Sequence, residues 1–533
     1  MSSRPAEPGA SQSAPASDKI PLRTRVAVGG ALLGAFMAVL NVQVVNTSLP
    51  DIQGGIGTGL DNGGWISTAY LIGEIIVIPL SGWLSQVFSL RRYLIGSTFL
   101  FLFFSAACGM VSNFPEMVTL RALQGFSGGV LIPLSLICVI TLLPERARPA
   151  GFALFALSAT FAPAIGPTIG GAITDIYGWR YIFFLNLVPG AVMLVALIWG
   201  LDPAPMQLKK FAQGDWGGII AIAIGLGALQ IVLEEGNKDD WFGSPFILRL
   251  SIVSALALSA FLVLELRPGN KSPLVNLRLF ARWNFAFASI SNFMLGFVLY
   301  AAVYLIPIYL AVAHGYSARQ SGEVMAWIGL PQLLIIPFMP RLMRQFDPRH
   351  LLVFGFSLFA VSSFMNMNLG PNDSGPQLLI PNLVRAVGQA LVFPPITLIA
   401  TAGIALKDSS SASSLFNMLR NLGGAIGIAV VQTFVTNREK FHSAIMTPQV
   451  SLLSPATQQR LDMLQRYFQA HGMSDPQAAR HEAIMAVGRI IQGQANYLAY
   501  GDAFALLGAG MIVAAVAALF LSKPAGTAPP GAH

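Results

Sequence analysis

Charged residues are scarce in this chain. Asp, Glu, Lys and Arg make up 11% of its 533 residues, hydrophobic residues make up 54%, and the mean hydropathy is +0.64. A soluble domain carries about 25% charged residues, so the composition excludes an ordinary soluble protein and predicts a chain that lies in a lipid bilayer. The net charge of +8 does not require a nucleic-acid partner, because membrane proteins collect Lys and Arg on their cytoplasmic side.

Residues that hold metals or carry out covalent chemistry are also few. The six histidines show no metal-ligand spacing, and the two cysteines, Cys108 and Cys138, lie in apolar stretches where we expect them to pack. No phosphate-binding glycine loop is present, which argues against ATP as an energy source. No nucleophile–base arrangement can be read either. We therefore expect no metal, no cofactor and no enzymatic activity, and no cleavable signal peptide is apparent.

Long apolar stretches take up most of the chain. About fourteen stretches of roughly 20 residues are long enough to cross a bilayer as helices. With the N-terminus placed in the cytoplasm, 19 Lys and Arg residues fall on the cytoplasmic side and four in or next to the short turns on the other side; six more lie in the long outer segment 437–500, to which the rule for short loops does not apply. Those four are Arg180, Lys238, Arg249 and Arg319. This asymmetry predicts an all-α, multi-pass membrane protein with both termini in the cytoplasm.

A short internal repeat suggests two halves. The segment beginning at Arg121 (RALQGF) resembles the one beginning at Arg385 (RAVGQA), and each precedes proline within an apolar stretch. Parallel halves of this kind are common in transporters. The predicted organisation is a disordered cytoplasmic tail (1–25), a six-helix half (26–201), two extra helices with linkers (202–283), a second six-helix half (284–522) and a cytoplasmic tail (523–533).

A polar segment, 437–500, separates the last two predicted spans, 412–436 and 501–522, on the outer side. Two amphipathic runs in it repeat apolar residues at helical spacing, and the second begins after Asp475-Pro476, a typical helix start. We expect a helical hairpin outside the membrane. It serves either as a self-packed cap or as a docking site for a partner.

Two charged residues lie well inside the predicted spans. Glu74 is the single carboxylate deep in the first half, and burial disfavours its charged form, as suits a group that takes up and releases a proton. It is otherwise a neutral, hydrogen-bonded packing residue. Arg121 cannot usefully lose its proton. In one interpretation it is a fixed positive charge that tunes a nearby acid or anchors an anionic group. In the other it is a structural residue that binds helix-end carbonyls.

Uncharged polar residues in the spans have two interpretations. They line a substrate cavity, or they join helices through hydrogen bonds. The candidates for the cavity are Asn41, Gln43, Asn46, Gln124, Asn292, Tyr300, Tyr304 and Gln389. The acidic run 234–240, by contrast, is expected to form a solvated loop. The run Gly166-Pro167-Thr-Ile-Gly170-Gly171 favours close, bendable contact with another helix.

Five stretches together resemble the major facilitator superfamily, and more closely its fourteen-span drug:proton antiporters of the EmrB/QacA type. The stretch 40–50 resembles the first-span motif, and Gly82 to Arg92, with Arg91, resembles the loop motif after span two. The stretch 121–129 resembles the proton-relay motif, 162–171 the antiporter motif of span five, and 179–190 is also family-like.

The resemblance implies a fold, an energy source and partners. It implies two six-helix halves plus an extra helix pair, export of small molecules driven by a proton gradient, and motif residues that govern conformational change. It also implies a Gram-negative inner membrane, a periplasmic adaptor of the HlyD/EmrA type and an outer-membrane channel.

Three positions depart from the family pattern. Asn41 and Gln86 stand where aspartates are usual, and Ser89 stands where glycine is usual. Because the first-span acid is missing, our hypothesis assigns the proton-carrying role to Glu74, near Arg121. A proton-linked importer of the same fold and a non-transporting membrane enzyme or sensor are the alternative functions.

Overall fold

A computed structural model describes residues 20–267, 273–451 and 453–523, and in these ranges every regular element is helical. Most of the two predicted tails lies outside the described residues. Fourteen helical segments in the described chain are long and apolar enough to cross a membrane, which confirms the predicted fold class. Both cysteines are free and buried, as expected of packing residues.

The first half contains six spans, of which two are interrupted. Its elements are α1 (Leu22–Thr47), α2 (Leu49–Ile56), α3 (Leu60–Gly63), α4 (Trp65–Phe88), α5 (Leu90–Met110), α6 (Phe114–Gly128), α7 (Leu131–Leu142), η1 (Glu145–Ala147), α8 (Arg148–Tyr177), α9 (Tyr181–Phe184) and α10 (Leu187–Gly200). Together α6 and α7 form one span, as do α9 and α10.

An extra helix pair follows, and then the second half. The pair is α12 (Trp216–Glu235) and α13 (Pro245–Leu266), preceded by α11 (Leu208–Ala212), with η2 (Trp241–Gly243) between them and η3 (Leu277–Ala281) after them. The second half is α14 (Trp283–His314), α15 (Ala318–Ile335), η4 (Ile336–Phe338), α16 (Met339–Gln345), α17 (Pro348–Met365), α18 (Leu379–Thr401), η5 (Leu406–Asp408), α19 (Ser409–Met446), η6 (Thr447–Gln449), α20 (Pro455–Ala470) and α21 (Pro476–Leu519).

Local chemistry explains several helix starts. The side chains of Asn113, Asp215 and Asp475 accept hydrogen bonds from backbone N–H groups in the first turns of α6, α12 and α21. Ser317 and Gln320 form a reciprocal capping box at the start of α15. These side chains satisfy N–H groups that have no partner within the helix.

The two halves meet along two groups of helix contacts, one formed by α8 and the other by α4 and α7. From the first half, α8 packs against α15 and α18, while α4 and α7 pack against α19 of the second half. Small residues bring the backbones together: a Cβ atom at Gly322 of α15 would lie 2.6 Å from the backbone nitrogen of Thr168 on α8. The extra helix α12 packs beside α4 and also contacts α19.

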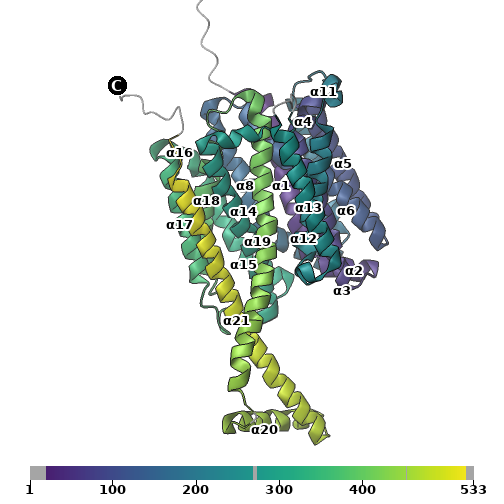
Figure 1. The fold of residues 1–533 in the computed structure, drawn as a ribbon, viewed down its shortest axis with the longest axis vertical. Helices are drawn as coiled ribbons and strands as arrows, with labels where there is room; N and C mark the ends of the chain where they lie inside the picture. Colours follow the sequence, from purple (N-terminus) through teal and green to yellow (C-terminus); the bar gives the residue numbers. More distant parts are fainter. Residues whose placement is uncertain (1–19, 268–272, 452, 524–533) are drawn as a thin grey trace, which may run out of the picture.

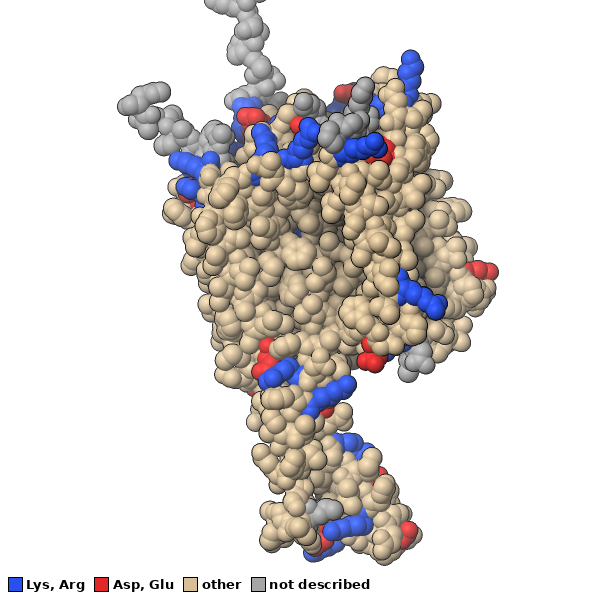
Figure 2. All heavy atoms as spheres, viewed as in Figure 1, with Lys and Arg blue, Asp and Glu red and all other residues tan. Residues whose placement is uncertain are grey.

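The bundle has two chemically different ends. Lys and Arg side chains gather at the end where α11 and α16 lie, which we call the basic end (Figures 1 and 2). Between this end and the other, the visible surface is almost uncharged (Figure 2). Exposed apolar side chains such as Leu256 and Val263 of α13 contribute to this belt, as expected where helices face lipid.

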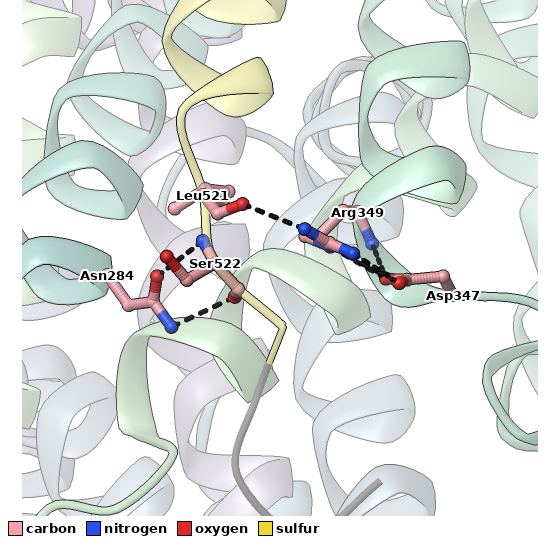
Figure 3. Close-up of polar contacts among 5 residues, drawn as sticks. All are labelled: Asn284, Asp347, Arg349, Leu521 and Ser522. Atoms are coloured by element: carbon pink, nitrogen blue, oxygen red, sulfur yellow. Dashed lines mark hydrogen bonds and ion pairs between the residues drawn. The ribbon is translucent and has the colours of Figure 1, made fainter. Parts of the chain in front are cut away.

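At the basic end, polar contacts join the last helix to two others (Figure 3). Asn284 at the start of α14 exchanges two hydrogen bonds with the backbone of Ser522. Arg349 donates to the Leu521 carbonyl at 3.2 Å and pairs with Asp347 at 2.8 Å. Arg91 in the first half likewise donates, at 2.8 Å, to a backbone carbonyl near the end of α10. In each half, the third span (α5 or α17) thus binds the C-terminal end of the sixth span (α10 or α21).

At the other end, α19 and α21 extend beyond the bundle and α20 lies across their far ends (Figure 1). We call this the projecting end. The prediction placed a two-helix hairpin before a last span at 501–522. In the structure the second amphipathic run is instead the start of α21, which continues into that span as one helix of 44 residues. Nothing in this run breaks a helix, so hydrogen bonding continues across the change from polar to apolar sequence.

Contacts near the bundle hold the projecting helices in place. Asp502 of α21 accepts hydrogen bonds at 2.6 Å from Arg438 and at 2.8 Å from His442, both on α19. Farther out, Asp462 of α20 pairs with Arg480 of α21 at 2.6 Å. The projecting part is therefore helical, with α21 packed against both α19 and α20.

Candidate functional site

A cavity between the halves opens toward the projecting end. Its wide part, the vestibule, has a volume of about 700 Å³ and is lined by residues of α1, α2, α4, α8, α12, α14, α15 and α19. A smaller part, the central pocket of about 90 Å³, continues from it and shares Gln43, Asn46, Glu234 and Tyr300 with the vestibule. Cavities that hold drug-sized ligands have volumes of roughly 300–1,000 Å³.

Near the basic end the halves are in contact. The hydroxyl groups of Ser81 on α4 and Ser414 on α19 lie 3.1 Å apart, and Ser413 donates to the Pro133 carbonyl of α7 at 2.9 Å. Gly82 allows this approach, because a Cβ atom there would lie 3.1 Å from the Ser414 hydroxyl and 3.2 Å from Ser410. The structure is therefore open toward the projecting end and closed toward the basic end.

Glu74 lies where the two halves meet. Its side chain belongs to α4, lines the central pocket and is only 7% exposed. One carboxylate oxygen accepts a hydrogen bond of 3.1 Å from the Asn421 amide on α19. The guanidinium groups of Arg420 and Arg121 are within electrostatic reach. A change in the charge of Glu74 thus alters its interactions with residues of both halves.

Arg121 is buried in the first half. Its guanidinium donates to Asn41 at 2.9 Å, to Gln124 at 2.8 Å and to the Ile66 carbonyl at 3.2 Å. It also lies 4.3 Å from the centre of the Tyr70 ring. The cation is held by neutral acceptors and an aromatic face, where the family pattern would place an acid at position 41.

The structure divides the predicted cavity residues into two groups. Gln43, Asn46, Tyr300 and Tyr304 line the vestibule, and the first three also line the central pocket. The remaining four are at most 2% exposed and line neither part; these are Asn41, Gln124, Asn292 and Gln389.

Helix contacts account for the four residues outside the cavity. Asn41 and Gln124 bind Arg121, Asn292 donates to the Phe416 carbonyl at 2.7 Å, and Gln389 accepts from Gln332 at 2.8 Å. Asn41, Asn292 and Gln389 thus join different helices, whereas Gln124 binds Arg121 within α6; none of the four lines the described cavity. The sequence shows that a residue is polar, but the rotation of its helix decides what it faces.

The glycines of the antiporter-like motif lie against α1. A Cβ atom at Gly166 would collide with Gln43, and one at Gly170 would lie 2.9 Å from the Val44 carbonyl oxygen. Pro167 lines the vestibule, and Gly171 is buried on the same helix. The motif therefore makes close contact with the helix that carries two cavity residues.

The loop motif after α4 lies at the basic end. Arg91 binds the end of α10, Arg92 is exposed, and Gln86 accepts a hydrogen bond of 3.3 Å from Lys210 of α11. Ser89, where glycine is usual, has a φ of +68°. Its conformation is one that glycine adopts without strain and serine does not.

The acidic run requires a correction. Glu234 and Glu235 form the last turn of α12 and line the vestibule, and Glu235 is only 5% exposed. The expectation of a solvated loop was wrong for these two residues. The helix α12 packs beside α4, and its last turn lies in the cavity wall. Glu235 accepts from Thr68 of α4 at 3.3 Å and pairs with Lys238 at 3.4 Å.

Sequence reasoning also missed Gln230 and Asn421 as cavity residues. Gln230 lines the central pocket one helical turn before Glu234 and donates to it at 3.0 Å. Asn421 follows Arg420 within an apolar stretch. The i, i+4 spacing of Gln230 and Glu234, and the polar pair 420–421, were the signals available in the sequence.

Two helical halves surround a central cavity that carries several polar side chains and opens at one end. This arrangement defines the class of the protein: a multi-pass membrane transporter. Residues 31–428 match the sequence model of the Major Facilitator Superfamily. The chain belongs to this superfamily.

Relatives of known name match almost the whole chain. The Colistin resistance protein EmrB of Acinetobacter baumannii is 30% identical over 512 residues, which cover 95% of this chain and 98% of the relative. The Multidrug export protein EmrB of Escherichia coli K12 is 30% identical over 505 residues, covering 94% and 96%. These matches confirm the resemblance to EmrB/QacA-type drug antiporters.

A solved structure agrees on the fold. The human organic anion transporter MFSD10 (TETRAN) superposes with a TM-score of 0.57 at 16% identity, covering 92% of this chain and all of the other. At this identity the similarity concerns architecture alone.

Proposed function

We propose that the chain is a proton-coupled multidrug efflux transporter that works by alternating access. The observation that carries the proposal is the position of Glu74. This carboxylate lines the central pocket, and its hydrogen bond to Asn421 links α4 of one half to α19 of the other. The relatives named for multidrug export and colistin resistance support drugs as the substrate class.

The mechanism follows from the charge on Glu74. As a carboxylate, Glu74 forms a charge-assisted hydrogen bond with Asn421 while the cavity is open toward the projecting end. A proton that enters through the vestibule neutralises Glu74 and weakens that bond. The neutral site then favours rearrangement of the halves, opening at the basic end and uptake of substrate from the cytoplasm. Release of the proton to the cytoplasm restores the first shape.

Buried contacts of Arg121 support a positioning role. Three hydrogen bonds and the Tyr70 ring fix its guanidinium, so its positive charge stays in place while Glu74 changes charge. The proton gradient is the proposed energy source, without a cofactor.

Substrate-dependent proton movement in vesicles tests the proposal. Everted membrane vesicles that contain the wild type should concentrate ethidium or N-phenylnaphthylamine when acidified inside, and should leak protons when substrate is added. Glu74→Gln should reduce proton-driven uptake at least tenfold while the protein remains folded in the membrane. Equal, protonophore-insensitive uptake by both proteins would contradict coupling through Glu74, and net flux in the opposite direction would indicate an importer.

We also infer that the basic end faces the cytoplasm of a Gram-negative cell and that the projecting end faces the periplasm. The excess of Lys and Arg at the basic end supports this orientation. Because both native cysteines are buried, single added cysteines report accessibility. A membrane-impermeant maleimide applied to spheroplasts should label Tyr467→Cys on α20 and spare Lys210→Cys on α11. The reverse pattern would invert the orientation.

The projecting helices are the proposed docking site for a periplasmic adaptor of the HlyD/EmrA type, which would lead to an outer-membrane channel. Large apolar side chains remain exposed there, including Met463 (57%), Tyr467 (54%) and Met485 (50%). A self-packed cap would bury such residues, whereas a docking surface presents them. Photo-crosslinking from position 467 should capture the adaptor, and Tyr467→Ser with Met485→Ser should reduce its co-purification. If the double variant co-purifies as much adaptor as the wild type does, this surface is not the docking site.

A further inference from the structure

One part of the cavity wall comes from outside the two six-helix halves. The last two turns of α12, one of the extra helices, contribute Gln230, Glu234 and Glu235 to the cavity. The extra pair is therefore more than a linker between the halves. Its polar side chains lie in the same space as Glu74.

The two carboxylates of α12 differ in their partners. Glu235 is held by Thr68 and forms an ion pair with Lys238. Glu234 lines both the vestibule and the central pocket, and it accepts a hydrogen bond from the neutral amide of Gln230. The neutral amide of Gln230 orients the Glu234 carboxyl group without supplying a positive charge.

Aromatic rings line the same part of the cavity. Tyr300 of α14 lines both the vestibule and the central pocket, as Glu234 does, and Tyr304 lines the vestibule within electrostatic reach of Glu234. Gly424 of α19 leaves room for the Tyr300 ring, because a Cβ atom there would overlap it. A carboxylate and aromatic rings in the wall of one cavity are groups that can together recognise an organic ammonium group.

We propose that Glu234, Tyr300 and Tyr304 form a subsite for the cationic group of lipophilic ammonium or phosphonium substrates, separate from the proton-binding carboxylate. Glu234 supplies the charge and the tyrosine rings supply cation–π contact. Glu74 then exchanges protons without having to hold the substrate. The inference rests on the proposed export function and extends it to a chemical class of substrate.

Binding to purified protein tests the subsite directly. Tetraphenylphosphonium should bind the wild type, and Glu234→Gln should raise its Kd about tenfold or more. Tyr300→Phe keeps the aromatic face and should bind almost as well as the wild type, whereas Tyr300→Leu should bind several-fold more weakly. Asp240→Asn is the matched control, since Asp240 is exposed in the turn after α12 and does not line the cavity.

Transport separates this inference from the proposed function. Glu234→Gln should lose ethidium export but retain proton-driven export of the neutral dye N-phenylnaphthylamine, whereas Glu74→Gln should lose both. An unchanged Kd for tetraphenylphosphonium in Glu234→Gln, or equal binding by Tyr300→Leu and the wild type, would overturn the subsite even if export is proton-driven. No proton-driven export of either dye by the wild type would instead reject the proposed function.

Discussion

Asn421 on α19 donates a hydrogen bond of 3.1 Å to the carboxylate of Glu74 on α4, and so joins two residues 347 positions apart across the contact between the halves. A hydrogen bond to a charged group contributes roughly 1.5–3 kcal/mol. Its loss is enough to change the ratio of two conformations about tenfold or more. This contact links the charge of one side chain to the shape of the whole molecule.

Removal of the amide should therefore shift the conformational balance. Asn421→Ala should populate the form that is open at the basic end, because the carboxylate loses its partner across the interface. Maleimide labelling of a cysteine introduced at Ser81, where the halves touch, should become several-fold faster. If the Ser81→Cys variant is labelled at the same rate with and without Asn421→Ala, the Asn421–Glu74 hydrogen bond does not hold the two halves together.

The Asn41–Arg121 contact should tolerate an acid but not an apolar residue. Asn41→Asp keeps an acceptor near the guanidinium, which now lies 2.9 Å from the Asn41 side-chain oxygen. Asn41→Leu removes the acceptor of one of the three hydrogen bonds that Arg121 donates, and the unpaired buried N–H group should cost about 1–3 kcal/mol of stability. We expect the thermal midpoint in detergent to fall for Asn41→Leu and to stay close to the wild-type value for Asn41→Asp. The opposite order would mean that Arg121 does not depend on this acceptor.

Ser89→Gly should stabilise the protein. Ser89 has φ +68° and ψ 145°, a region that suits glycine, and among the described residues its buried hydroxyl has no hydrogen-bond partner. Relief of backbone strain is worth about 1–3 kcal/mol, and the greater freedom of glycine in the unfolded chain offsets about 1 kcal/mol of it. For a chain of this length the thermal midpoint should rise by about 1–2 °C. Ser89→Ala, which keeps the strain, is the control and should not produce this increase.

The contact between Asp347 and Arg349 should make stability depend on pH. Hydrogen bonds from the Arg349 side chain lower the pKa of Asp347, which lies between α16 and α17 outside the spans. A lowered pKa means that the contact stabilises the fold at neutral pH and loses this effect as the pH falls below the usual aspartate value of about 4.

Asp347→Asn isolates that charge, because asparagine still caps the start of α17. At pH 7 the variant should be less stable than the wild type by about 1 kcal/mol, and the difference in thermal midpoint should narrow below about pH 4. A difference that stays constant across this range would assign the effect to the cap and not to the ion pair.

The spans were predictable because the bilayer restricts the backbone so strongly. A backbone in lipid must satisfy its own hydrogen bonds, so each apolar stretch of sufficient length becomes a helix, and hydropathy alone locates it. Glu74 could be selected for the same reason, since a lone carboxylate in such a stretch is costly unless it has a use or a partner. The motif glycines were recognisable because close helix contact requires small residues.

The polar residues show where prediction ends. Gln43 and Asn46 line the cavity, whereas Asn41, on the same helix, turns into the first half and binds Arg121. Glu234 looked like part of a solvated loop until the packing of α12 placed it in the cavity wall. Polar residues that are close in the sequence can thus face either the cavity or the interior of one half.

By itself, the sequence determined the number of spans, the asymmetry of charge and the presence of a few costly polar groups, because these depend on local composition and the thickness of the membrane. Only the tertiary structure decided which polar groups come together: Asn421 binds Glu74, Asn41 binds Arg121, and Glu234 lines the same cavity as the tyrosines of α14. These pairings depend on how each helix is rotated and which helix lies beside it. Contacts spread over the whole bundle set that rotation, and no single stretch of sequence contains them.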